Sequence, residues 1–261
     1  MELEVKNGSF SYRSGTPVLL DVNFAIASNE ILTILGANGA GKTTLLKCLL
    51  GFERWSSGQT LIDGHDLREI SAKDLWSRIG YVPQAKAPTF SYTVLDLVLM
   101  GRSVHLGDFA APKRHDYDLA SAALERVGIA HLSERLCHEI SGGQYQLALI
   151  ARALVGEPRL LVLDEPESNL DYKNQLQVLE LLTDLSVKDG VGSVINTHYP
   201  AHALEIGDKA LVMIPQAAPV FGETSETVTE ENLSKSFGVG VTIVETPVPA
   251  RPGFKSVVAH R

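Results

Sequence analysis

Residues 36–44 read GANGAGKTT, and they stand between an apolar run at 31–35 and a helical-looking stretch at 45–50. This is the pattern G-x-x-x-x-G-K-[ST] in the strand, loop and helix context that gives it meaning. The glycines let successive backbone N–H groups point into one concavity, to which the following helix adds its positive end. The segment therefore predicts a polyphosphate site, with Lys42 reaching the β and γ phosphates and the Thr43 hydroxyl offered to Mg²⁺. The nucleotide-binding residues predicted here are Gly36, Ala37, Asn38, Gly39, Ala40, Gly41, Lys42, Thr43 and Thr44.

The composition is that of a globular chain, with 261 residues, 44% of them hydrophobic and 21% charged. This length favours one full α/β core with an inserted subdomain over two independent domains. A net charge of −8 without a basic stripe argues against nucleic-acid binding. No apolar run approaches the ~18–20 residues of a membrane span, and the opening MELEVKNGSF shows no signal pattern, so we expect a cytosolic chain. Cys48 and Cys137 fit a reducing compartment, and Cys48, which stands among leucines, is interpreted as a buried structural thiol.

The rest of the chain alternates between strand and helix patterns. The strand patterns lie at 3–5, 22–26, 58–62, 79–84, 159–163 and 191–196, the helical spacings at 94–154 and 176–185, and the clearest early turn at 14–17. This alternation predicts an α/β fold with a mainly parallel sheet covered on both faces, and the long helical stretch predicts an insertion. We expect a core of 1–85 and 155–215 with an N-terminal β part, a helical subdomain at 86–154, and a small appendage with a loose end at 216–261.

A second chemical feature is the strand LLVLD at 160–164, which ends in two carboxylates. The carboxyl end of a strand is where a doubly wound sheet presents residues to ligands. Asp164 fits a residue that holds Mg²⁺, and Glu165 fits a general base that polarises the attacking water. A strand that merely exits into acidic loop residues is the alternative, and the phosphate loop makes that alternative the weaker one.

A third feature is the sequence SGGQ at 141–144, followed by the helical pattern of residues 147–154. Ser141 fits a helix cap, and together with Gly142, Gly143 and Gln144 it predicts a second anion cradle at a helix N-terminus. Because the chain already has one phosphate loop, a second cradle makes most sense if it serves the nucleotide of another subunit.

Taken in order, these motifs resemble those of the ATP-binding cassette (ABC) ATPases, and the resemblance covers nearly the whole chain. Residues 36–44 are similar to the phosphate loop, 141–144 to the signature, 160–166 to the magnesium strand and 168–171 to the D-loop. Gln84 matches the glutamine loop, His198 the switch histidine, and Tyr12 the position where the family stacks an aromatic ring on adenine. The resemblance implies a P-loop NTPase fold with a RecA-like core and an antiparallel N-terminal part, ATP and Mg²⁺ as cofactors, and ATP hydrolysis.

The resemblance also implies roles for individual residues. It gives catalytic roles to Glu165, His198, Lys42 and Gln84, and metal contacts to Thr43, Gln84 and Asp164. His198 follows an apolar strand, so a neutral imidazole there is positioned to bond the γ-phosphate; a structural histidine is the alternative. The corresponding alternative for Tyr12 is a plain turn aromatic.

Several positions depart from the commonest family pattern. Ala37 replaces a frequent proline and Thr43 a frequent serine, whose hydroxyl it keeps, so neither change threatens nucleotide binding. Tyr145 stands where arginine or another polar residue is usual, Glu167 where threonine is usual, and Asn196 is polar in an apolar strand. These departures bear on the catalytic rate and on dimer contacts, and they leave the class unchanged.

The segment 90–102 is most similar to one branch of the family, the importers for metal chelates, cobalamin, haem and molybdate or tungstate. The resemblance implies a head-to-tail homodimer on the cytoplasmic face of the membrane, bound to integral membrane permease subunits and, indirectly, to a periplasmic or lipoprotein substrate-binding protein. Many residues of this segment are apolar, so we expect an exposed patch that docks the permease. The alternatives are a soluble ABC ATPase outside transport, a regulator that scarcely hydrolyses ATP, and an exporter subunit.

Overall fold

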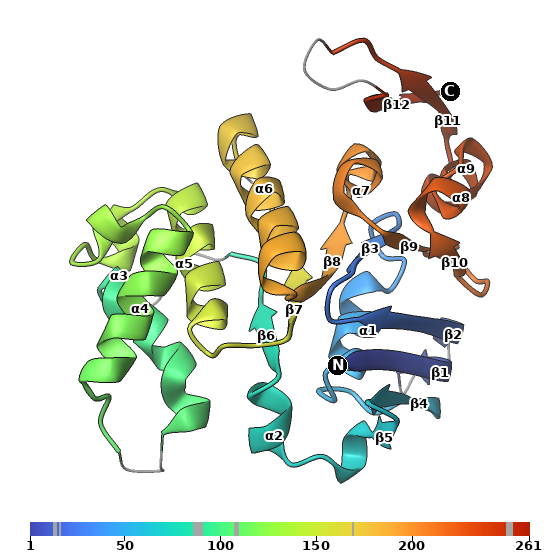
Figure 1. Cartoon of the computed structure of the whole chain (residues 1–261). Coiled ribbons are helices and arrows are strands. Elements are labelled where there is room, and N and C mark those ends of the chain that lie inside the picture. The colour runs from blue at the N-terminus through green and yellow to red at the C-terminus, as the bar shows by residue number, and fades with distance from the viewer. Residues whose placement is uncertain (13–14, 16, 86–90, 107–109, 169, 249–252) are drawn as a thin grey trace. The chain divides into compact units, whose positions relative to one another are not determined.

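The computed structural model describes residues 1–12, 15, 17–85, 91–106, 110–168, 170–248 and 253–261. Their contacts divide them into two compact units, one of residues 1–70 and 192–261 and the other of residues 71–191. Figure 1 shows the elements of both units, coloured along the chain. In the part of the chain that is described, no helix combines the length and the apolar character needed to cross a membrane.

The first unit begins with an antiparallel sheet, as the sequence predicts. Its strands follow the order β2-β1-β4-β5, and a short 3₁₀ turn η1 comes after them. Asp63 and Gly64 both have positive φ, 50° and 79°, which suits the tight turn between β4 and β5. The turn predicted at 14–17 lies partly outside the described residues. The bounds are β1 (Glu2–Ser11), β2 (Pro17–Ala27), β4 (Ser57–Ile62), β5 (His65–Asp66) and η1 (Leu67–Glu69).

A second group of strands in this unit is parallel. Strand β3 lies between β8 and β9 and runs parallel to both, while β10 adds an antiparallel edge to β9. All five residues of β3 are buried, which is typical of a central parallel strand. The register pairs Leu35 with Thr197 and with Val212, so the chain leaves all three strands at one edge. The bounds are β3 (Ile31–Leu35), α1 (Lys42–Leu49), β8 (Gly192–Thr197), α7 (Pro200–Ile206), β9 (Lys209–Val212) and β10 (Val220–Glu223).

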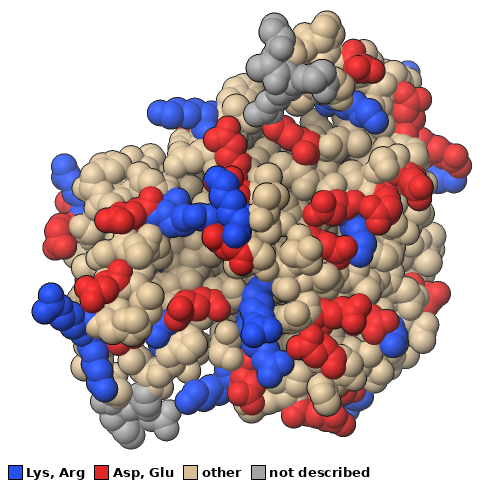
Figure 2. Space-filling view, in the orientation of Figure 1, with Lys and Arg blue, Asp and Glu red and all other residues tan. Residues whose placement is uncertain are grey.

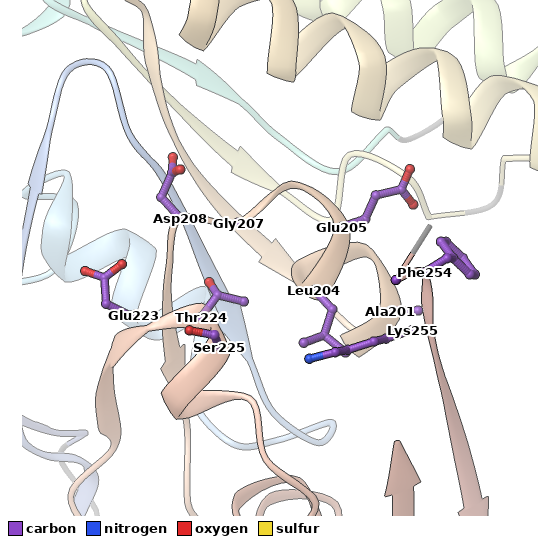
Figure 3. A pocket seen from close by; sticks show the side chains of 11 residues that line it. Ala201, Leu204, Glu205, Gly207, Asp208, Glu223, Thr224, Ser225, Phe254 and Lys255 are labelled. Atoms are coloured by element: carbon purple, nitrogen blue, oxygen red, sulfur yellow. The ribbon is translucent and has the colours of Figure 1, made fainter. Parts of the chain in front are cut away.

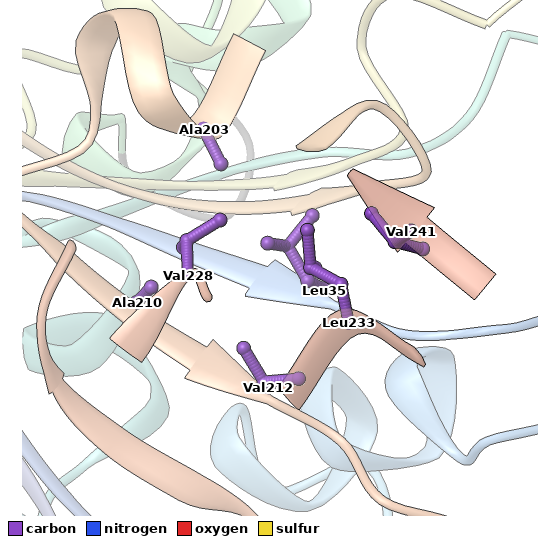
Figure 4. Close-up of a cluster of buried hydrophobic side chains, with 7 residues drawn as sticks. All are labelled: Leu35, Ala203, Ala210, Val212, Val228, Leu233 and Val241. Carbon is purple, nitrogen blue, oxygen red and sulfur yellow. The ribbon is translucent and has the colours of Figure 1, made fainter. Parts of the chain in front are cut away.

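The C-terminal part differs from the expected loose end. Strand β10 belongs to the sheet, and β11 and β12 form an antiparallel pair that continues to His260, so that expectation is wrong. The reason is burial, because Val241 belongs to a buried cluster (Figure 4), and Ile243 and Val257 pack against that cluster. The cluster consists of Leu35, Ala203, Ala210, Val212, Val228, Leu233 and Val241. The bounds are α8 (Thr224–Thr227), α9 (Glu230–Phe237), β11 (Gly240–Glu245) and β12 (Lys255–His260).

The same cluster ties the C-terminal part to the phosphate loop. Leu35, the last residue of β3, is fully buried in it and directly precedes Gly36. The hydroxyl of Ser236 donates a hydrogen bond to the carbonyl of Met213 at 2.8 Å, and the Met213 N–H donates to the carbonyl of Leu35 at 2.8 Å. Helix α9 therefore stabilises the position from which the loop starts.

A cavity of about 600 Å³ lies in the first unit among α7, α8 and the start of β12. Figure 3 shows Leu204 and Lys255 on one side of it and Thr224 and Ser225 on another. The lining also includes the carboxylates of Glu205, Asp208 and Glu223. None of the residues predicted to bind nucleotide or metal lines this cavity.

The second unit holds the helical stretch and two parallel strands, β6 and β7. Helices α3, α4 and α5 contact one another (Figure 1). The helical subdomain predicted at 86–154 falls within this unit; its boundaries stay a prediction, and residues 86–90 lie outside the described part. The bounds are α2 (Ala72–Trp76), β6 (Ile79–Val82), α3 (Val94–Leu99), η2 (Met100–His105), α4 (Arg114–Arg126), η3 (Ala130–Leu132), η4 (Cys137–Glu139), α5 (Gly142–Leu154), β7 (Leu160–Asp164) and α6 (Tyr172–Asp189).

A buried ion pair joins three parts of the second unit. Arg102 of η2 donates to the carboxylate of Asp116 at 3.0 Å and to the carbonyl of Val155 at 2.9 Å. The backbone N–H of Lys113 and the Arg102 guanidinium together hold the pKa of Asp116 below its usual value. This side chain thus links η2, α4 and the end of α5.

We predict that Leu233→Ala destabilises the chain, because the side chain is fully buried among six other apolar residues. The expected loss is about 2–5 kcal/mol, the range for deleting a buried leucine side chain. The matched control is Val258→Ala in β12, whose side chain is 50% exposed. The measurement is the melting temperature of both variants. An equally small decrease in Leu233→Ala and Val258→Ala would contradict the assignment of this cluster as core.

Candidate functional site

The phosphate loop runs from the end of β3 to the start of α1, in the strand, loop and helix arrangement that the sequence predicts. Gly39 and Gly41 have φ of 81° and 94°, and Gly41 is the N-cap of α1. These angles lie in the left-handed region that residues with a Cβ rarely adopt. Gly36 is needed for a different reason, since a Cβ there would lie 2.9 Å from the Cβ of Met213.

The other predicted loop residues differ in exposure. Lys42 and Gly36 are buried, which places them at the base of the loop. Asn38, Gly39 and Thr43 are exposed, while Ala37, Ala40, Gly41 and Thr44 are half-buried. The exposed hydroxyl-bearing residue, Thr43, directly follows the lysine and belongs to the first turn of α1.

Lys42 and His198 meet although 156 residues separate them in the sequence. The ammonium of Lys42 donates to the carbonyls of Gly36 at 2.7 Å and Ala37 at 3.1 Å, and it lies 3.2 Å from Nδ1 of His198. An ammonium has no acceptor, so with Lys42 as donor Nδ1 accepts and the ring proton is on Nε2. The parallel register of Leu35 with Thr197 explains the contact, because the loop and His198 leave neighbouring strands at one edge.

Tyr12 lies beside the phosphate loop. Its hydroxyl is 3.2 Å from the hydroxyl of Thr44, and its ring packs edge-on against Phe10 with centroids 4.8 Å apart. The side chain is nevertheless 44% exposed. A supported ring with an open face next to a phosphate loop suits the stacking of a flat base.

The second unit brings Gln84 and Glu165 together. Strand β7 is buried throughout and ends at Asp164, while β6 pairs Val82 with Leu163 in parallel. Residues two positions beyond that pair therefore lie at the same edge, and Nε2 of Gln84 donates to Oε2 of Glu165 at 3.0 Å. Burial, together with the negative charge of Asp164, raises the pKa of the nearby Tyr81 hydroxyl.

Sequence reasoning missed one partner of Glu165. The hydroxyl of Ser168 donates to the same oxygen, Oε2, at 2.9 Å. The available signal was the turn sequence Glu-Pro-Glu-Ser at 165–168, whose proline favours a tight turn that returns the serine to the glutamate. From the family resemblance alone, Ser168 is expected only as part of the D-loop.

The cradle at 141–144 forms the start of α5, as predicted. The Ser141 hydroxyl accepts from the Gln144 N–H at 3.3 Å, and the Gln144 side-chain oxygen accepts from the Ser141 N–H at 3.0 Å. This reciprocal pair is a capping box. A Cβ at Gly143 would lie 2.7 Å from the Asn174 side chain, whereas one at Gly142 would meet nothing within 4 Å. Packing within the chain therefore explains the second glycine and leaves the exposed first one unexplained.

The other unusual residues noted in the sequence, which include the two cysteines, are buried or half-buried. Glu167 and Asn196 are 1% and 0% exposed, and Tyr145 is half-buried on α5 with a pKa raised mainly by burial. Cys48 is fully buried, and burial with the nearby charge of Glu53 raises its pKa to about 12. Both cysteines are free and buried, which agrees with the structural interpretation given to Cys48.

Comparison with known proteins gives consistent matches over most of the chain. A family model described as ABC transporter matches residues 19–168, more than half of the sequence. The molybdate import ATP-binding protein MolC of Haemophilus influenzae is 42% identical over 235 residues, covering 90% of this chain and 87% of that protein. A Helicobacter pylori protein assigned to iron chelatin transport as ATP-binding protein is 37% identical, covering 88% of this chain and 92% of that protein.

The fold has a similar match among solved structures. A chain of an inward-facing ABC transporter assigned to the metal-chelate type superposes with a TM-score of 0.89 at 38% identity. The match covers 99% of this chain and 97% of that chain. The sequence matches and the fold match therefore agree over most of the chain.

Proposed function

Because this chain belongs to the ABC transporter family as an ATP-binding subunit, we propose that it energises an importer of an oxyanion or a metal chelate. Membership also confirms the predicted fold and identifies the chain as an ATP-binding ATPase. The observation that carries the proposal is the contact of Lys42, a residue of the phosphate loop, with His198. It gathers a phosphate-binding ammonium and an imidazole where the γ-phosphate of ATP would lie.

Each cluster has a distinct task in this proposal. Lys42 and the loop N–H groups bind the phosphates, Tyr12 stacks on adenine, and His198 donates from Nε2 to the γ-phosphate. Glu165 accepts a proton from water as the water oxygen bonds to the γ-phosphorus and the bond to ADP breaks. The products are ADP and inorganic phosphate, and the proton taken from water is left on Glu165.

The proposal includes Mg²⁺, and the residues fit it. In this proposal the hydroxyl of Thr43, the amide oxygen of Gln84 and the carboxylate of Asp164 would be its ligands, because this hard cation prefers oxygen. Burial and, after it, the negative charge of Asp164 raise the pKa of the Tyr81 hydroxyl. The ion would neutralise charge on the phosphates when bound.

Glu165→Gln is expected to abolish steady-state hydrolysis and to keep ATP binding. The amide preserves the shape of the side chain but cannot accept the proton, so the loss should exceed a hundredfold. Phosphate release and the affinity for a fluorescent ATP analogue are the two measurements. Hydrolysis near the wild-type rate would show that Glu165 is not the base.

We further propose that two copies of the chain assemble head to tail, each closing the nucleotide site of the other. One phosphate loop and one cradle per chain make such an arrangement symmetric. Gly142 supports it, because this exposed glycine has room for a side chain within its own chain. Its missing side chain is then explained by a phosphate of the partner's ATP approaching the helix N-terminus.

Gly142→Asp tests the composite site. The carboxylate meets no clash in the chain and suits a helix N-terminus, so the melting temperature should hold. Its charge would repel the partner's phosphates, so hydrolysis should fall at least tenfold, whereas the control Gly142→Ala should be milder.

Mixing Gly142→Asp with Lys42→Ala adds a check on the same point. Each mixed dimer keeps one intact composite site and one doubly damaged site, so activity should return. No recovery in demonstrated mixed dimers would argue against the head-to-tail arrangement, and a full-rate Gly142→Asp variant would contradict it outright.

The segment predicted to dock a permease exposes fewer apolar residues than the sequence suggests. Of the apolar residues described in 91–102, Val94, Leu97, Val98 and Leu99 are buried and Leu95 is half-buried. Tyr92 and Met100 are 40% and 41% exposed, and Phe90 lies outside the described residues. We propose that Tyr92 and Met100 contact an integral membrane permease, which in turn meets the substrate-binding protein.

Tyr92→Asp should leave the basal ATPase intact and reduce its stimulation by the reconstituted permease several-fold. The reason is that a charge would be buried at an apolar contact without a partner. Tyr117→Asp is the matched control, since Tyr117 is an equally exposed tyrosine of the same unit, at 44%. If the permease stimulates Tyr92→Asp as strongly as Tyr117→Asp, Tyr92 does not belong to the docking surface.

The cargo and location follow from the relatives in this proposal. Molybdate import and iron chelatin transport are the assigned tasks of the two relatives, so an oxyanion or a metal chelate is the cargo class. The chain then works as a peripheral subunit on the cytoplasmic face of the membrane. On the face drawn in Figure 2, acidic and basic side chains are interspersed without a continuous basic area, which suits a protein partner better than nucleic acid. Uptake of molybdate, tungstate and an iron chelate by the purified permease complex distinguishes the cargoes.

A further inference from the structure

Two hydrogen-bond donors converge on one oxygen of Glu165. Nε2 of Gln84 lies 3.0 Å from Oε2, and the hydroxyl of Ser168 lies 2.9 Å from the same atom. The three residues come from the segment after β6, the end of β7 and the turn that follows it. Two donors on the same oxygen restrict how the Glu165 carboxylate can turn.

The backbone holds Ser168 in place for this contact. Glu165 has φ of 52°, in the left-handed region, and the Ser168 N–H donates to the Glu165 carbonyl at 3.1 Å. This hydrogen bond closes a tight turn with Pro166 in its second position, where proline is favoured. A left-handed glutamate is strained, so other contacts must maintain it.

Helix α6 supplies such contacts. Gln175, which is only 7% exposed, donates from Nε2 to the carbonyls of Glu167 at 3.3 Å and Leu170 at 3.2 Å. It therefore anchors the chain on the far side of the turn. The Ser168 hydroxyl is thus carried by a turn that is fixed at both ends and aimed at a single carboxylate oxygen.

We propose that Ser168 is a positioning residue for the general base, which rests on the proposed role of Glu165. Its hydroxyl holds Oε2 and thereby orients the carboxylate that accepts the proton. The O–H bond of water breaks as its proton binds the Glu165 carboxylate, while the water oxygen bonds to the γ-phosphorus and ADP leaves. Gln84 shares the task of holding Oε2, and Ser168 is the donor that the turn anchored by Gln175 carries.

The test compares Ser168→Ala with Ser168→Thr in the full-length chain. Loss of one hydrogen bond to a charged group should lower kcat about ten- to a hundredfold. KM for ATP, nucleotide affinity and melting temperature should change little, because the base acts only in the chemical step. Threonine keeps the hydroxyl and should restore kcat to within a few-fold of wild type.

Ser71→Ala is the matched control. The Ser71 hydroxyl donates to the carboxylate of Asp74 at 2.7 Å in the same unit, away from Glu165, so its removal should leave kcat unchanged. Two results would overturn the positioning role, provided that Glu165→Gln is inactive. One is a normal kcat in Ser168→Ala. The other is a lower kcat that is accompanied by a raised KM and a lower melting temperature. An active Glu165→Gln variant would instead overturn the proposed base, and this inference with it.

Discussion

The parallel register of buried strands is the constraint on which the site depends. Leu35 pairs with Thr197 across β3 and β8, and Val82 pairs with Leu163 across β6 and β7. Each pairing fixes two chain exits at one edge within the spacing of neighbouring strands, roughly 5 Å. The contacts of Lys42 with His198 and of Gln84 with Glu165 follow from these pairings. A shift of one residue in either pairing would separate the pair of side chains that depends on it.

Burial in turn maintains the register. Strands β3 and β7 are buried along their whole length, so a slip would move apolar side chains and leave backbone groups unpaired. The C-terminal part adds to this at the end of β3, where Leu233 and Val241 cover Leu35 and the Ser236 hydroxyl binds the carbonyl of Met213. The segment expected to be an appendage thereby supports the strand that carries the phosphate loop.

The phosphate loop and the segment that carries the proposed base differ in which residues adopt a left-handed backbone conformation. In the phosphate loop the left-handed positions are glycines, Gly39 and Gly41, which adopt them at little cost. Directly after β7 the left-handed residue is Glu165 itself, whose carboxylate the proposed function requires. The turn closed by Ser168 and anchored by Gln175 is the local structure that keeps this glutamate in place. Binding thus relies on permissive residues, and the proposed base relies on enforced geometry.

Local features of the site could be predicted from the sequence because their cause is local. The glycine spacing specifies the phosphate loop, the Ser141 and Gln144 pair specifies a helix cap, and the apolar run before Asp164 specifies a buried strand. Only the tertiary structure decided what depends on distant partners. It joined Lys42 to His198, gave Gly143 its reason in the Asn174 side chain, and buried most of the segment expected to dock a permease. Sequence spacing fixes a turn or a cap within a few residues, whereas strand register and packing are settled by burial over the whole unit.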